Sequence, residues 1–162
     1  MNKNKHLPIF NNFMEISLRI AILLSELDGK YCDLNRLTYY DYLLIHSGDI
    51  ENAPESLHPE NPFRIGDVLA RRELIKKAVE FLCKKQLITT NFNENGIVYS
   101  SSSLTKVFIN HLDSSYSEKT KGIAKWIASE FHLYGDKELS EYITNNLHKW
   151  GGNFSQVGFR SK

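Results

Sequence analysis

The stretch of sequence that decides the fold runs from residue 66 to residue 100 and reads GDVLARRELIKKAVEFLCKKQLITTNFNENGIVYS. Its first part predicts a helix over about 66–86. The side of this helix that we expect to be apolar consists of Leu74, Ala78, Phe81 and Leu82. Two β-prone runs follow, at 87–92 and 97–100, with Asn95-Gly96 between them. Because an Asn-Gly pair readily adopts positive φ, the two runs predict a β-hairpin.

Two further helices are expected before this stretch. The first has an apolar residue at every third or fourth position, at Phe13, Ile16, Ile20, Leu24 and Leu27. The second is expected over about 34–46 and is apolar nearly all round, which is typical of a helix that is buried or forms an interface. Three helices followed by a hairpin is the order of a winged-helix domain, although other folds also use it.

Three more helices are expected after the hairpin. A short one starts at about 101–103, with Leu104, Val107 and Phe108 as apolar residues. A longer one follows, and a last one starts at Asp136. The inner faces of these two helices consist of Tyr116, Ile123, Ile127 and Phe131, and of Leu139, Ile143 and Leu147.

The predicted fold class is therefore mainly α with a small β-hairpin. We expect a single domain over 11–150, in which a winged-helix-like part (about 11–100) precedes a C-terminal helical extension (about 101–150). Residues 1–10 are expected to be a disordered lead, and residues 151–162 a mobile tail.

Composition disfavours several classes of protein. The 162 residues carry 20 Lys+Arg against 19 Asp+Glu, whereas a free-standing nucleic-acid binder usually has a basic excess. The two cysteines, Cys32 and Cys83, are too few for a disulfide framework and fit no zinc motif. No segment is apolar over the ~20 residues that a membrane-spanning helix needs, which predicts a cytoplasmic protein without membrane contact.

Signatures of catalysis do not occur in the sequence. Phosphate-binding, dinucleotide-binding and serine-nucleophile motifs are missing, and the six histidines are scattered without metal-ligand spacing. We therefore predict no catalytic residue, no metal, no cofactor and no enzyme activity.

The third predicted helix carries a basic surface. Seven residues between 64 and 85 are basic and three are acidic. The third helix of a winged-helix domain commonly enters a DNA groove. The candidates for contact with the DNA backbone are Arg71, Arg72, Lys76, Lys77, Lys84 and Lys85. The alternative is a solvated helix face with a Glu73–Lys77 pair.

A surplus of aromatic residues predicts a second kind of binding, because protein interfaces are enriched in Tyr and Trp. The aromatic candidates for a partner interface are Tyr40, Tyr42, Trp126 and Trp150. Core packing is the alternative for these side chains.

A long connection is expected between the second and third helices. Residues 47–62 contain three prolines, which exclude regular helix, and connections of this length are often functional. We expect a rigid loop-to-helix unit at the partner surface, because docking a stiffened loop costs less ordering entropy. Its residues are His46, Asp49, Ser56, Leu57, His58 and Arg72. The alternative is that this unit only stabilises the subunit's own fold.

One order of motifs extends from residue 40 to residue 87. It contains YDYLLIHSGD at 40–49, PESLHP at 54–59, and RRELI at 71–75. This order resembles the middle component of ABC-three-component systems, a group that includes Lamassu-type defence systems. The resemblance covers about residues 10–135, and Trp126 in Ala-Lys-Trp also suits it.

The resemblance implies a small adaptor encoded with two other proteins. One is an SMC- or ABC-like ATPase with a long coiled coil, and the other is an effector, often a nuclease. The adaptor would bind near the ATPase heads or coil and hold the effector inactive until phage or plasmid DNA is sensed. The family supplies no established catalytic residues. The alternative function is a stand-alone winged-helix transcription regulator that binds DNA through its third helix.

Overall fold

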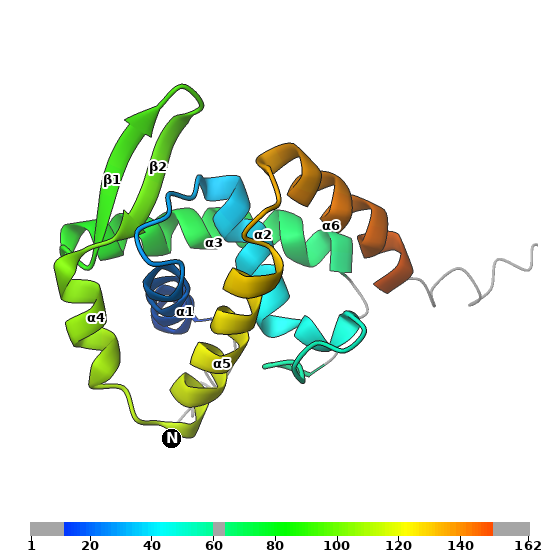
Figure 1. Ribbon diagram of the computed structural model, residues 1–162, viewed down its shortest axis with the longest axis horizontal. Helices are drawn as coiled ribbons and strands as arrows, with labels where there is room; N and C mark the ends of the chain where they lie inside the picture. The colour runs from blue at the N-terminus through cyan, green and yellow to red at the C-terminus, as the bar shows by residue number, and fades with distance from the viewer. Residues whose placement is uncertain (1–11, 60–63, 151–162) are drawn as a thin grey trace, which may run out of the picture.

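The computed structural model describes residues 12–59 and 64–150. The elements of this part of the chain are, in order, helices α1 (Phe13–Glu26) and α2 (Leu34–Ile45), the 3₁₀ turn η1 (Ser47–Asp49), helix α3 (Arg64–Lys84), strands β1 (Ile88–Asn93) and β2 (Gly96–Ser101), and helices α4 (Ser103–Asn110), α5 (Ser115–Glu130) and α6 (Asp136–Trp150) (Figure 1). The expected lead at 1–10 and tail at 151–162 lie outside the described residues, as does the end of the long connection at 60–63.

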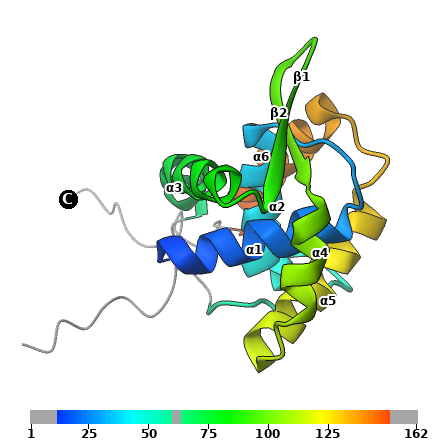
Figure 2. The same ribbon diagram turned by 90° about the vertical axis from the view of Figure 1, so that its left-hand side faces the viewer.

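This order confirms the predicted fold class, a mainly helical, winged-helix-like fold with one antiparallel hairpin. The strands pair from Ile88 opposite Ser101 to the pair that closes the turn, Asn93 opposite Gly96. Gly96 has a φ of +111°, a conformation that glycine adopts without steric cost. The backbone of Cys32 exchanges two hydrogen bonds with Tyr99, at 2.9 and 2.8 Å, which adds one bridge to the hairpin. The hairpin extends away from the helices (Figure 2).

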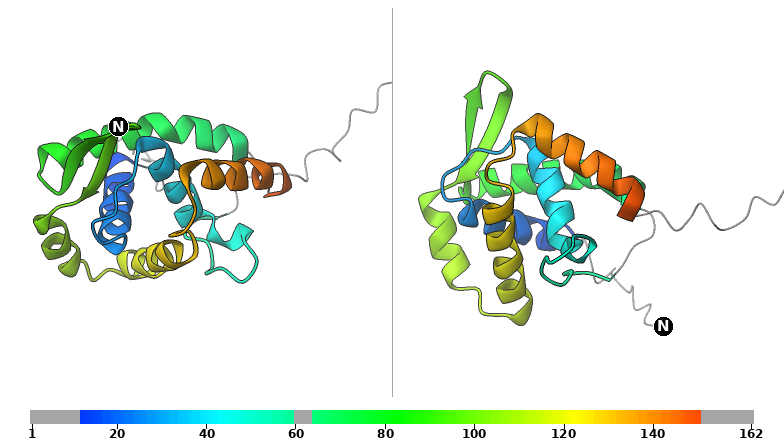
Figure 3. Two further views of the ribbon diagram at one scale, coloured as in Figure 1. Left: turned by 45° about the horizontal axis from the view of Figure 1, so that its top comes forward. Right: turned by 45° about the vertical axis from the view of Figure 1, so that its right-hand side comes forward.

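Helix α1 occupies the centre of the molecule. It contacts α3, α4 and α5, and Figure 3 shows it between α3 and α5. The predicted inner residues Ile16, Ile20 and Leu24 are fully buried, whereas Phe13 is 37% exposed. Because α1 is covered from several sides, its burial extends beyond the single predicted face and includes Arg19.

Helix α2 is a core helix. Tyr40 and Tyr42 are 1% and 0% exposed, so they offer no surface to a partner. Core packing, the alternative to an interface role, is what the structure shows for both side chains. The Tyr40 hydroxyl accepts a hydrogen bond from Arg36, and the Tyr42 hydroxyl donates one to Asp49.

Helix α3 buries much of the predicted apolar side, since Ala78 and Leu82 are buried and Phe81 is half-buried. Its C-terminal half buries Ile75, Ala78, Val79 and Leu82. Leu74, which was expected on the apolar side, is 37% exposed. The side that α3 turns inward also determines which of its basic residues face solvent.

The last three helices begin as expected, but α4 packs differently from the other two. Ser102 and Thr105 form a capping box at the start of α4. The predicted inner faces of α5 and α6 are confirmed: Ile123, Ile127, Phe131, Leu139, Ile143 and Leu147 are buried and Tyr116 is half-buried. In α4, by contrast, the apolar residues Leu104, Val107 and Phe108 are 46%, 55% and 36% exposed.

Candidate functional site

A cluster of charged side chains is buried where α1, α2 and α3 meet. Asp41 of α2 accepts hydrogen bonds from Arg19 Nε at 2.7 Å and from Arg19 Nη2 at 3.1 Å. Its Oδ2 also accepts from Nη1 of Arg71 in α3, at 2.8 Å. Arg19 and Asp41 are 0% exposed and Arg71 is 2% exposed. One carboxylate therefore links three helices through two arginines.

The cluster continues from Arg71 to the end of α2. Nη2 of Arg71 donates to both carboxylate oxygens of Asp67, at 2.8 and 2.9 Å. The Oδ2 of Asp67 lies 3.1 Å from Nε2 of His46, which is buried. His46, a candidate for the partner-binding unit, is thus bonded within the subunit.

At its other end the cluster reaches the proline-rich connection and α5. Arg19 donates to Glu15 at 3.0 Å, and Nε2 of His58 lies 2.8 Å from the same carboxylate. The hydroxyl of Tyr116 also donates to Glu15. His58 is buried, so this second histidine of the expected unit holds the connection against α1.

Electrostatics favour the charged form of the cluster. Burial alone would raise the pKa of Asp41, but Arg19 and Arg71 outweigh burial and lower that pKa. Burial would likewise raise the pKa of Asp67, but the hydrogen bond from His46 and the charge of Arg71 outweigh burial, and the pKa falls to about 2. Perturbed carboxylates can mark catalytic sites, but ion-pair networks inside a core perturb them equally. These carboxylates are bonded to arginines in the core, and we assign them a structural role.

Arg71 is therefore a correction to the expected DNA-contacting set. Its guanidinium belongs to the core and cannot reach phosphates. The sequence contained a signal for this, because Arg71 is four, seven and eleven residues before Ile75, Ala78 and Leu82. At 3.6 residues per turn these spacings place it on their face.

The lowered pKa values predict a loss of stability in acid. Folding lowers the pKa of Asp67 from 3.8 to about 2, so the ionised side chain stabilises the fold fully above about pH 5. This contribution, about 2 kcal/mol, is lost as the pH falls towards 2. Burial and the charge of Arg19 lower the pKa of His58 from 6.5, so its contribution is also present above that pH and decreases below it.

Thermal melting between pH 7 and pH 2 measures this effect. The Asp67→Asn variant is expected to be less stable at pH 7 and to show a shallower decrease between pH 4 and pH 2. Equal slopes for the variant and the natural chain would contradict the assignment.

The long connection is held in place by contacts within its own subunit. Ser47 Oγ donates to the carbonyl of Glu55 at 3.2 Å, and the backbone N–H of Gly48 donates to Ser56 Oγ at 2.9 Å. A Cβ at residue 48 would lie 2.8 Å from Ser56 Oγ, so a side chain here would displace the hydroxyl that accepts this hydrogen bond. Leu57 is half-buried against the core. These contacts favour the alternative in which the connection stabilises its own fold.

Arg72 lies apart from that connection. It is exposed, and its Nε donates to Asn35 at the start of α2, at 3.1 Å. It belongs instead to an exposed basic surface of α3 and the residue that follows it, which consists of Arg72, Lys76, Lys77, Lys84 and Lys85. Glu73 and Glu80 are exposed among them. The hairpin, at 88–101, contains no Lys or Arg.

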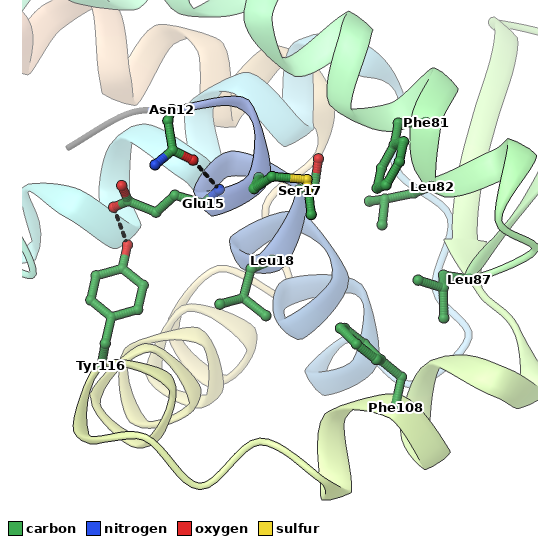
Figure 4. Close-up of a pocket in the computed structure, with 10 residues that line it drawn as sticks. Asn12, Glu15, Ser17, Leu18, Phe81, Leu82, Leu87, Phe108 and Tyr116 are labelled. Carbon is green, nitrogen blue, oxygen red and sulfur yellow. Dashed lines mark hydrogen bonds between the residues drawn. The ribbon is translucent and has the colours of Figure 1, made fainter. Parts of the chain in front are cut away.

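An apolar groove is open between α1, α3, α4 and α5. Its volume is about 410 Å³. The apolar residues that line it are Met14, Leu18, Phe81, Leu82, Leu87 and Phe108. Figure 4 shows Leu18 on α1, with Phe81, Leu82, Leu87 and Phe108 on one side of it and Tyr116 on the other. Met14 is 60% exposed, so the groove is accessible from solvent.

The outer face of α4 extends this apolar surface. Leu104 is four residues before Phe108, which places the two side chains on the same face of the helix. Contiguous exposed apolar area of this kind marks binding sites, whereas single exposed residues are ordinary. The sequence patterns do not indicate the groove, because its lining comes from segments up to about a hundred residues apart and each segment was expected to face the core.

The two tryptophans are half-buried in an aromatic cluster. Trp150 stacks on Tyr42, with ring centroids 5.8 Å apart, and lies 6.1 Å from Tyr142. Trp126 lies edge-on to Phe131 at 5.8 Å. Part of the surface of each tryptophan is therefore packed against the core, and the rest is exposed.

Together, the fold and these surfaces define a mainly helical, winged-helix-like protein with an internally bonded charged core and an open apolar groove. A family model described as ABC-three component (ABC-3C) system Middle Component 2 matches residues 9–153. The chain belongs to this family, which confirms the resemblance found in the sequence. It is therefore one component of a multi-subunit system.

Comparison with curated proteins and with solved structures found no significant match. Over residues 12–59 and 64–150, no helix has both the length and the apolar composition that a membrane crossing requires. The same residues contain no group of three or more His, Cys, Asp or Glu side chains placed to hold a metal ion.

Proposed function

We propose that this chain is the non-catalytic adaptor of a bacterial defence complex of the Lamassu type. It joins an SMC- or ABC-like ATPase to a nuclease-type effector, acts against phage or plasmid DNA, and works in the cytoplasm. The observation that carries the proposal is the match to a middle component over residues 9–153.

The apolar groove supports the proposal. An adaptor needs surface that is apolar enough to bind a protein, and the groove together with the exposed apolar residues of α4 offers such area. Amphipathic helices bind in grooves of this kind through apolar side chains spaced three or four residues apart. We assign the groove to the ATPase, because the coiled coil that the family resemblance implies presents exposed helices.

The candidates on the connection have a supporting role in this proposal. Asp49, Ser56 and His58 hold residues 47–59 in one conformation through hydrogen bonds within the subunit. A connection that is already ordered loses little entropy when a neighbouring surface binds. Leu57 and the exposed parts of Trp126 and Trp150 supply contact area beside it.

Contact with DNA is a second element of the proposal. Arg72, the exposed lysines 76, 77 and 84 of α3, and Lys85 after it form a surface suited to phosphates, which position a protein on DNA without specifying sequence. A stand-alone regulator would need sequence-specific contacts from α3. The hairpin carries one Glu and no basic residue, so it adds no attraction for DNA.

Co-expression of the three components tests the adaptor role. With a tag on the ATPase, we expect effector recovery to fall at least ten-fold when this chain is omitted. Effector recovery that is independent of this chain would overturn the proposal. A sequence-specific gel shift by the isolated chain at physiological salt, with competitor DNA present, would favour the transcription regulator instead.

A further inference from the structure

A small aromatic pocket lies between the connection and the last two helices. Its volume is about 180 Å³. The connection contributes Ile50, Glu51 and Asn52, the end of α5 and the turn after it contribute Trp126, Glu130, Phe131 and Tyr134, and α6 contributes Tyr142. Four of the eight lining residues are therefore aromatic and two are acidic.

The rings of this pocket are set at steep angles to one another. Trp126 and Phe131 are inclined at 87°, and Tyr134 and Tyr142 at 84°, with centroids 5.8 Å apart in both pairs. Phe131 joins the two pairs, at 5.2 Å from Tyr134 and 5.5 Å from Tyr142. In both pairs the edge of one ring packs against the face of the other, so the rings hold one another in place. Trp126, Tyr134 and Tyr142 are half-buried, and their remaining ring surface is available to a cation.

The two carboxylates of the pocket lack counter-ions. Within residues 12–59 and 64–150, neither Glu51 nor Glu130 forms an ion pair or a side-chain hydrogen bond, and both are exposed. They differ in this from Glu15, Asp41 and Asp67, which are all bonded in the core. Negative charge beside electron-rich ring faces strengthens the attraction for a cation, so the pocket favours a positively charged ligand.

We infer that this pocket receives a basic side chain, an arginine guanidinium or a lysine ammonium, from a protein partner of the complex. The inference rests on the proposed adaptor function and specifies the chemistry of one of its contacts. Trp126 supplies ring surface, and Glu51 and Glu130 supply the charge. A pocket of about 180 Å³ accommodates one such side chain but no helix, so this contact adds specificity to a larger interface.

The inference predicts a charge-dependent loss of partner binding. The natural chain and a double variant, Glu51→Lys with Glu130→Lys, are titrated against the purified ATPase–effector pair at physiological salt. Because the variant places positive charge where the partner's cation binds, we expect its affinity to be at least ten-fold lower. The matched control, Glu80→Lys with Glu94→Lys, changes the net charge equally at exposed positions outside the pocket and is expected to bind within two-fold of the natural chain.

A second measurement uses methylguanidinium chloride as the probe. We expect it to compete with partner binding and to shift the Trp126 indole N–H signal in NMR spectra of the full chain, with sodium chloride at equal ionic strength as the reference. Equal affinity of the pocket variant and the natural chain, or no change at Trp126, would overturn the inference and leave the adaptor function intact. If the natural chain binds neither component, the adaptor function and this inference both fail.

Discussion

Replacing Asp41 by alanine is expected to lower the free energy of unfolding by about 3–5 kcal/mol, the cost of leaving buried charge without its partner. Arg19 and Arg71 both donate to this carboxylate and are at most 2% exposed. Its removal leaves two guanidinium groups in the core with fewer compensating charges. Urea unfolding followed by circular dichroism measures the change.

The matched control for this prediction is Asp136→Ala. Asp136 also binds an arginine, with 2.6 Å between its Oδ1 and Nε of Arg36, but its side chain is 58% exposed. Exposed ion pairs contribute about 0–1 kcal/mol, so the control is expected to remain close to the natural chain. Similar losses of unfolding free energy in the two variants would show that burial does not explain the contribution of Asp41 to stability.

A compensated variant separates charge from packing. Replacing Arg19, Asp41 and Arg71 together by Met, Leu and Met removes the three charges at the centre of the cluster and keeps side chains of similar size. Because apolar replacements of buried ion pairs are often neutral, much of the stability lost in Asp41→Ala is expected to return. The stability that does not return would measure the loss of the hydrogen bonds from the arginines to Glu15 and Asp67.

Placing charge in the apolar groove is expected to weaken binding to the proposed ATPase partner strongly while the chain stays folded. The combined variant Met14→Asp and Phe108→Asp puts two carboxylates on surface that a partner helix would dehydrate, and desolvating them without a partner is costly. We expect at least a hundred-fold loss of affinity. Titration of the separate ATPase against the adaptor measures it, with circular dichroism to establish folding.

The control for the groove is an exposed leucine elsewhere. Leu69 of α3 is 73% exposed and does not line the groove, whereas Met14 is 60% exposed and does. Leu69→Asp should therefore bind as the natural chain does, and Met14→Asp alone should be weakened. If both single variants bind normally and the double variant is folded, the ATPase does not use this groove.

Local sequence patterns were sufficient for the order and type of the elements. Apolar residues at helical spacing predicted α5 and α6, and Asn95-Gly96 predicted the hairpin of β1 and β2. The two turn residues are Glu94 and Asn95, and of the pair Asn95-Gly96 only Gly96 has positive φ. Such features depend on neighbours within a few residues, so a single sequence contains them. The order of motifs between 40 and 87 was likewise enough to identify the family, because it is a property of the chain itself.

Tertiary packing alone decided which buried charges pair and where apolar surface stays open. Asp41 is 22 residues from Arg19 and 30 from Arg71 along the chain, and their pairing exists only because three helices cross at one point. The same holds for the groove and for the aromatic pocket, whose linings are gathered from distant segments. Composition indicates that a side chain is basic or aromatic, but its partner and its exposure are set by which helices meet in the folded chain.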